Sequence, residues 1–206
     1  MRQLLWFVFA FLCGSLPFSV WIGRSLLKRE IRGYGDANPG ATNVRRAGGK
    51  FTWILALLLD FVKGVLPVWL AYHWAGLNGG ALILIALAPV LGHAFSPFLN
   101  FKGGKAVAVT GGIWCGLTLW EGPTVAGLLL GLFVGLLTVD AWAVILAMIG
   151  TMLYFMLTPP AWNGLDLRPD RAVLLAIGIG NLLILAWKHR VDLTKPLTFR
   201  SWAKNS

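Results

Sequence analysis

The chain has 206 residues, of which 57% are hydrophobic and only 13% are charged. A mean hydropathy of +0.72 excludes an ordinary water-soluble domain, because the apolar runs are too long to be buried against one another in so short a chain. The net charge of +10 is compatible with nucleic acid, anionic lipid or anionic substrates. In a membrane protein we expect membrane lipids and anionic substrates as partners, and no nucleic acid.

Seven apolar runs follow one another along the chain, and each predicts a membrane-spanning helix. They lie near residues 4–24, 51–72, 81–99, 106–120, 123–139, 141–158 and 171–187. The first run is longer than the apolar region of a signal peptide and no A-x-A site follows it, so we expect it to be a span. The sequence therefore predicts one all-α domain over residues 1–206, a polytopic membrane protein with about seven transmembrane helices.

Basic residues are unevenly distributed between the predicted loops. Segments 24–50 and 102–105 and the tail from Lys188 to Lys204 hold 14 of the 18 Lys and Arg residues. With seven spans these segments fall on the same side of the membrane. The positive-inside rule then predicts that the N-terminus is outside and the C-terminus is cytoplasmic.

The first polar stretch, GYGDANPGATNVRRAGGK, covers residues 33–50 between the first two predicted spans. The positive-inside rule explains its Arg and Lys residues but not its Gly and Asn residues. Gly and Asn tolerate left-handed backbone, which allows successive N–H groups to converge on an anion. Thr42 and Asn43 add side-chain donors, and Arg45 or Arg46 adds a forked guanidinium suited to phosphate. The stretch favours phosphate binding over a merely flexible loop.

The second stretch, GHAFSPFLNFKGGKAV, covers residues 92–107. Gly103 and Gly104 predict a tight turn into the next helix, with Lys105 as a point charge beside its N-terminus. Two anion sites on one face indicate a substrate with two phosphates, or two phosphorylated substrates. His93 fits either a structural role or a direct chemical one.

The third stretch, WKHRVDLTKP, covers residues 187–196. His189 and Asp192 are three residues apart, so the carboxylate could orient the imidazole on one helical turn. A solvated basic tail anchored by Trp187 is the alternative. Within the second predicted span, Asp60 and Lys63 have the same spacing and could neutralise each other, either for function or to tether helices.

Several kinds of site are not indicated by the sequence. Cys13 and Cys115 lie alone in apolar runs, so we expect neither a disulfide nor a metal site. Neither GGK forms a phosphate-binding P-loop motif, because Ser or Thr does not follow it and the required earlier Gly is missing. We therefore expect no cofactor, and no obligate protein partner is evident.

Five segments together resemble the bacterial membrane acyl-phosphate:glycerol-3-phosphate acyltransferase family. In chain order they are GSLPF (14–18), GDANPGATNVRRAGGK (35–50), DxxKG (60–64), GHAFSPFLNFKGGKAVA (92–108) and HRVDL (189–193). The resemblance implies a seven-span bacterial inner-membrane enzyme with a cytoplasmic active face. It would transfer an acyl chain from acyl phosphate to glycerol 3-phosphate, giving lysophosphatidic acid and phosphate in phospholipid synthesis.

The resemblance also implies which residues form the site. The implied catalytic residues are His189, Lys105 and Arg46. The implied substrate-binding residues are Asn38, Gly40, Thr42, Asn43, Gly103 and Gly104. Beside them, Asp36, Lys50, His93 and Asp192 are our own candidates for substrate binding. No residue is an obvious nucleophile, so direct transfer is implied, with His189 or a substrate phosphate oxygen as the base.

The chain departs from the family pattern at charged positions. Asp36 and Ala37 stand where the family usually has Ser and Gly, and Asp192 stands where it usually has Asn. Asp140, Ala141 and Trp142 lie where it tends to carry a Ser. A non-catalytic paralogue or transporter that binds a phosphorylated lipid or metabolite is therefore the alternative function. An altered acceptor is a third possibility, since Asp36 could bond a hydroxyl.

Overall fold

The computed structural model describes residues 1–160 and 167–201; Lys204 of the predicted cytoplasmic tail lies outside them. The α-helices are α1 (Arg2–Ser15), α2 (Phe18–Leu26), α3 (Ala41–Ala47), α4 (Lys50–Trp69), α5 (Gly79–Ala94), α6 (Val107–Thr118), α7 (Glu121–Leu136), α8 (Asp140–Leu157) and α9 (Arg171–Leu193). Short helical turns are η1 (Ile31–Gly33), η2 (Leu70–Trp74) and η3 (Pro97–Leu99). The only β pairing among these residues is an isolated bridge between Leu137 and Phe199, so the all-α prediction is confirmed.

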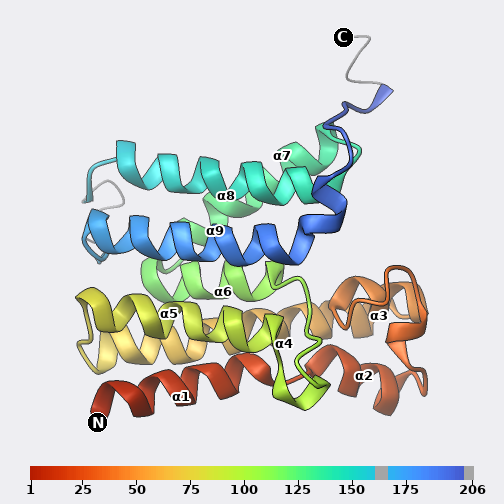
Figure 1. Ribbon diagram of the computed structural model, residues 1–206, viewed down its shortest axis with the longest axis horizontal. Helices are drawn as coiled ribbons and strands as arrows, with labels where there is room; N and C mark the ends of the chain where they lie inside the picture. The colour runs from red at the N-terminus through yellow and green to blue at the C-terminus, as the bar shows by residue number, and fades with distance from the viewer. Residues whose placement is uncertain (161–166, 202–206) are drawn as a thin grey trace.

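The long helices lie side by side along one direction, and α1 begins at the end of the molecule opposite to the end of α9 (Figure 1). Five segments are long and apolar enough to cross a membrane: Arg2–Leu26, Lys50–Trp74, Gly79–Leu99, Asp140–Leu157 and Arg171–Leu193. α6 and α7 are shorter, about 18 and 24 Å at 1.5 Å per residue, than the ~30 Å hydrocarbon core. The polytopic fold is confirmed in this coarser form, and the count of seven spans stays a prediction.

Small residues allow neighbouring helices to approach closely, as is common in membrane proteins. Gly64 of α4 faces Gly112 of α6, where a Cβ atom on Gly112 would lie 2.1 Å from the carbonyl oxygen of Phe61. Gly92 of α5 lies equally close to the backbone of α1, 2.2 Å from the carbonyl oxygen of Phe11 by the same measure. These contacts bring α4 close to α6 and α1 close to α5 without large interdigitating side chains.

The segment after α1 folds into a cap at one end of the helix bundle (Figure 1). Pro17 separates α1 from α2, for which it is the N-cap residue, because proline lacks the N–H needed to continue a helix. A small apolar cluster then packs α2, η1 and α3 on α4; its buried members include Val20, Ile31, Val44 and Ala56. The first polar stretch is therefore held in place and is not a loose loop.

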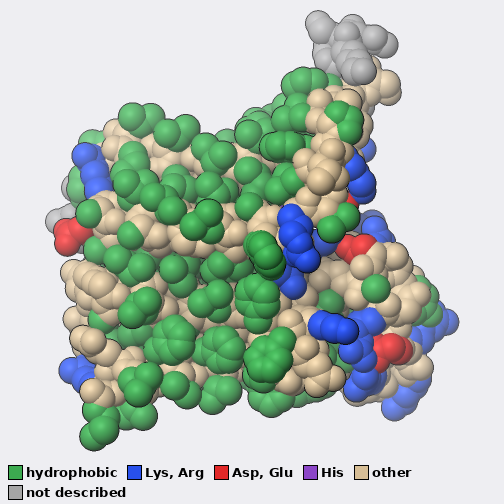
Figure 2. Space-filling model, in the orientation of Figure 1, with side chains coloured by type: hydrophobic (Ala, Val, Ile, Leu, Met, Phe, Trp, Pro, Cys, Tyr) green, Lys and Arg blue, Asp and Glu red, His purple; other side chains and the backbone are tan. Residues whose placement is uncertain are grey.

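Charged side chains gather at the same end of the molecule. In Figure 2, Lys and Arg cluster over the cap and the end of α9, whereas the opposite end shows few charges. On the face that Figure 2 shows, the surface between the two ends is mainly hydrophobic. This distribution is the one expected of a membrane protein with one strongly basic face.

Candidate functional site

The first stretch is organised around Asn43 of α3, whose side chain is buried. Its amide nitrogen donates to the carbonyl oxygen of Asn38 at 2.8 Å and to Oδ1 of Asp36 at 3.2 Å. Its amide oxygen accepts from Nη1 of Arg46 at 3.1 Å. Asn43 therefore folds the stretch back on itself and aims both Asp36 and Arg46 to one side.

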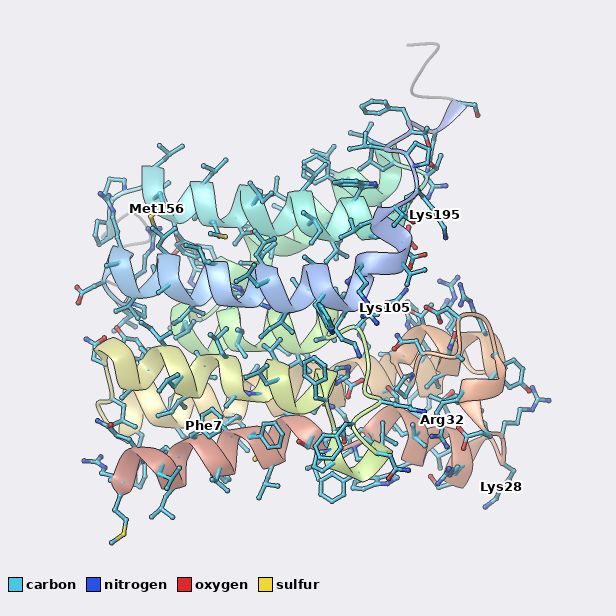
Figure 3. All side chains as sticks on the ribbon, in the orientation of Figure 1. Phe7, Lys28, Arg32, Lys105, Met156 and Lys195 are labelled. Atoms are coloured by element: carbon cyan, nitrogen blue, oxygen red, sulfur yellow. The ribbon has the colours of Figure 1, made fainter. Side chains whose placement is uncertain are left out.

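Lys105 joins all three stretches. Its Nζ lies 2.9 Å from Oδ2 of Asp36 and 2.9 Å from Oδ2 of Asp192. Each carboxylate has a second cation, since Arg46 lies 3.6 Å from Asp36 and Lys195 lies 2.8 Å from Asp192. Figure 3 shows Lys105 between the end of α9 and the cap. The three stretches, far apart in sequence, thus meet at one ammonium group.

The electrostatics of this cluster keep its members charged. Burial acts to raise the pKa of Asp36, but the hydrogen bond and charge of Lys105 outweigh burial and hold the pKa below its ordinary value of 3.8. Burial acts to lower the pKa of Lys105, but the hydrogen bonds and charges of Asp36 and Asp192 raise it above 10.5. At neutral pH the centre of the site is an ammonium flanked by two carboxylates.

The turn before Lys105 requires glycine at both of its positions. A Cβ atom on Gly103 would lie 2.0 Å from the carbonyl oxygen of His93, and one on Gly104 would lie 2.2 Å from Nε2 of that residue. Lys188 of α9 donates to the carbonyl oxygens of Ala94 and Gly103, at 2.9 and 3.0 Å. The GGK sequence therefore serves close packing, and Lys188 is a clamp that the sequence did not reveal.

The carboxylate of Asp192, one of the two alternatives for this stretch, is not what orients His189 among the contacts of the described residues. Asp192 bonds Lys105 and Lys195, while Nδ1 of His189 lies 2.9 Å from the carbonyl oxygen of Leu185. The carbonyl accepts, so Nδ1 carries the proton and Nε2 is the acceptor of the neutral ring. Two nearby cations competed for the carboxylate, and an ordinary i−4 carbonyl oriented the imidazole instead.

Not every predicted site residue reaches this cluster. Thr42 and Lys50 are exposed, on α3 and at the start of α4. Arg45 stacks on Trp53 at 5.0 Å, so of the two arginines it is Arg46 that faces Asp36. Gly40 caps the start of α3. The donors of Asn43, expected to be open to a substrate, are already used inside the stretch.

The predicted ion pair of Asp60 and Lys63 is present, at 2.7 Å and almost fully buried. His93 is also buried, 3.9 Å from Asp60. Ser19 donates to Asp60 at 2.8 Å and Ser96 donates to a backbone carbonyl at 2.6 Å. Ser19 lies alone in an apolar run, and Ser96 lies in the second stretch but has no spacing that marks it, so sequence reasoning missed both. Within the described part of the chain, three or more His, Cys, Asp or Glu residues never gather as a metal site would require.

A helical membrane fold with a cluster of basic side chains at one end defines an integral membrane protein with a candidate anion-binding site. Residues 4–198 match the family model described as "Glycerol-3-phosphate acyltransferase". The chain is 37% identical to glycerol-3-phosphate acyltransferase 1 of Thermotoga maritima, over 91% of the chain and 94% of the relative. It is 36% identical to the glycerol-3-phosphate acyltransferase of Methylobacillus flagellatus, over 96% and 94%.

Solved structures agree with this assignment. Two crystal structures of PlsY (YgiH), an integral membrane glycerol 3-phosphate acyltransferase, are similar to this chain. One is the glycerol 3-phosphate form and the other is the lysophosphatidic acid form. Their TM-scores are 0.77 and 0.76, at 30% identity over 94% of this chain and 91% of those chains. The chain belongs to the glycerol-3-phosphate acyltransferase family, and the predicted family resemblance is confirmed.

Proposed function

We propose that the chain transfers an acyl group from acyl phosphate to a hydroxyl of glycerol 3-phosphate, releasing lysophosphatidic acid and inorganic phosphate. The observation that carries the proposal is the meeting of Asp36, Lys105 and Asp192, because it brings the three stretches to one ammonium group, with Arg46 and Lys195 as further cations beside it. The names of the relatives and the ligands of the PlsY structures support this acceptor and product. We also propose that residues 1–206 form one domain, which the packing of the described helices against one another supports.

The reaction requires cations near the phosphoryl oxygens and correctly positioned substrates, and it proceeds without a covalent enzyme intermediate. The acceptor hydroxyl oxygen forms the new ester bond to the acyl carbon, the bond from that carbon to the phosphate oxygen breaks, and phosphate leaves. Lys105 and Arg46 would stabilise the charge on the phosphoryl oxygens, an effect that is strong when the groups are already in place. The hydroxyl proton would pass to Nε2 of His189 or to the departing phosphate.

The carboxylates of Asp36 and Asp192 define how the site would open. Both lie on Lys105, so an incoming phosphoryl group must displace at least one of them or share the ammonium with them. A displaced carboxylate remains near Arg46 or Lys195 and is free to accept a hydrogen bond from an acceptor hydroxyl. Asn38, Gly40, Thr42, Lys50 and the turn residues would then line the substrates.

The test is phosphate release by the purified protein given palmitoyl phosphate and glycerol 3-phosphate, with palmitoyl-CoA as the alternative donor. We expect phosphate and lysophosphatidic acid in equal amounts from acyl phosphate and no product from acyl-CoA. Tight binding of palmitoyl phosphate and glycerol 3-phosphate without turnover would instead support the non-catalytic alternative. Counterflow of labelled glycerol 3-phosphate in proteoliposomes would support a transporter.

We further propose a bacterial inner-membrane location with the N-terminus outside and the site cytoplasmic. The basic cap and the end of α9 support this orientation through the positive-inside rule. Thr42→Cys on the cap and Gly80→Cys at the opposite end test it, because both positions are exposed and a side chain at Gly80 meets nothing within 4 Å. An impermeant thiol reagent added to intact spheroplasts should label only the Gly80 variant; labelling of only the Thr42 variant would reverse the orientation.

A further inference from the structure

A second polar cluster lies under the site, within the helix bundle. Asp60 and Lys63 of α4 form an ion pair at 2.7 Å, with side chains only 3% and 4% exposed. His93 of α5 lies beside them with 9% of its side chain exposed. Charges buried at this depth are costly unless they are paired and hydrogen-bonded. The proposed chemistry uses none of these three side chains, so their presence needs another reason.

This cluster ties together segments that meet under the cap. Nζ of Lys63 donates to the carbonyl oxygen of Leu16 at 2.7 Å, at the break between α1 and α2. Oγ of Ser19 donates to Oδ2 of Asp60 at 2.8 Å. Ser96, just after α5, donates to the carbonyl oxygen of Ser15 at 2.6 Å. The broken first span is thereby held to α4 and α5 by polar contacts.

The same cluster supports the turn that presents Lys105. The backbone N–H of Gly104 donates to the carbonyl oxygen of His93 at 3.0 Å. A Cβ atom on Gly104 would lie only 2.2 Å from Nε2 of His93, so the imidazole packs directly against this turn. The imidazole and the residue that precedes Lys105 are therefore in direct contact.

A cavity of about 10 Å³ lies in the middle of the cluster, bordered by Asp60, His93, Ser96, Pro39 and Gly104 among others. That volume is the size of one water molecule. Nδ1 of His93 is 3.9 Å from Oδ1 of Asp60, too far for a direct hydrogen bond and suited to a water bridge. Among the described residues, Oδ1 of Asp60 has no hydrogen-bond partner beyond its ionic contact with Lys63.

We propose that Asp60 and His93 hold one water molecule between them, and that this bridged pair is a positioning device for the Gly103–Gly104 turn and hence for the ammonium of Lys105. The bridge makes Nδ1 of His93 the donor and turns Nε2 towards Gly104. His93 then acts through Lys105 and does not touch the reacting atoms. The inference rests on the proposed function for its link to turnover.

Substitutions of His93 separate the two ring nitrogens. In His93→Asn the amide nitrogen takes about the place of Nδ1, whereas in His93→Gln it takes that of Nε2. We expect His93→Asn to keep kcat/KM within about fivefold, and His93→Gln and His93→Leu to lose on the order of 100-fold, as for a displaced catalytic group. Activity retained by Gln and lost with Asn would place the role on Nε2 and overturn the proposal, as would equal activity of all three.

Substitutions that change the charge of the cluster provide a second test. Asp60→Asn should lower kcat/KM, and adding Lys63→Met should restore part of it by removing the unpaired ammonium. The matched control is neutralisation of Glu121 and Arg168, a buried ion pair near the opposite end with side chains 1% and 3% exposed, which should change thermal stability but not kcat/KM. Equal loss of kcat/KM in the control would overturn the proposal.

Two further readouts do not depend on turnover. Equilibrium binding of glycerol 3-phosphate should weaken in the His93→Gln variant and persist in the His93→Asn variant. If the wild-type protein binds glycerol 3-phosphate but releases no phosphate, the proposed function is wrong and this inference still holds. A high-resolution structure of the wild-type protein should show a water within hydrogen-bond distance of Asp60 Oδ1 and His93 Nδ1. A direct contact between the two side chains would overturn the inference. This test does not depend on whether the variants fold.

Discussion

Replacing Asp36 by Ser should strengthen phosphate binding at Lys105. Oδ2 of Asp36 lies 2.9 Å from Nζ of Lys105, so a phosphoryl oxygen bonded to the same ammonium would lie roughly 5 Å from this carboxylate. At that distance two unit charges repel by about 0.8 kcal/mol in the dielectric of water, and a dianion doubles the figure. The water value applies because the Asp36 side chain is 41% exposed.

A repulsion of about 1 to 2 kcal/mol corresponds to roughly a 5- to 30-fold change in affinity. We therefore expect the KM for one phosphorylated substrate to fall by roughly that factor in Asp36→Ser, and the effect to shrink at high salt. Phosphate release measured against each substrate in turn will show which phosphate uses Lys105. Asp170→Asn, an exposed carboxylate before α9, is the control and should change neither KM. If Asp36→Ser raises both KM values or leaves them unchanged, Asp36 does not compete with phosphate and the reasoning fails.

Three other predictions follow from the same region. Ala37 has a positive φ of 57°, so Ala37→Gly should stabilise the protein by up to about 1 kcal/mol in a denaturation experiment, and unchanged stability would contradict this. Gly104→Ala should abolish turnover because its Cβ meets His93, while Gly127→Ala on α7, where a Cβ meets nothing within 4 Å, should have wild-type turnover. The pKa of Lys105 is raised, so its ion pairs stabilise the fold below pH 10.5 and are lost only when the pH rises through the pKa of the folded state. The free energy of unfolding should therefore show no titration of Lys105 from roughly pH 6 to 9. An alkaline transition inside that window would contradict this prediction.

The fold could be predicted because hydropathy and helix length are tied to the membrane thickness. The long uninterrupted apolar runs are enough to predict an all-helical membrane protein, and the number of spans between the three polar stretches predicts that they lie at one end. The lengths of α6 and α7 could not be predicted, since Leu119 and Trp120 are apolar residues within the turn between these helices. Hydropathy alone reads such a turn as part of a span.

The site could be predicted only in part, because sequence places residues at one end of the bundle without fixing their rotation. Lys105 was expected to bind an anion, and the structure supplies two internal anions from Asp36 and Asp192. The spacing of His189 and Asp192 fits a pair and a solvated tail equally well, whereas in the structure Lys105, 87 residues from Asp192, binds the carboxylate. Asn43 was expected to bind substrate, but local geometry uses its donors first.

A structure with glycerol 3-phosphate bound tests most directly whether the three stretches form one phosphate site. We predict phosphoryl oxygens within hydrogen-bond distance of Lys105 in at least one substrate complex, with acyl phosphate analogues as the second ligand, and Asp36 or Asp192 moved away from the ammonium. The account would be contradicted if glycerol 3-phosphate and the acyl phosphate analogue both bound at other basic side chains while Lys105 kept its contacts with Asp36 and Asp192.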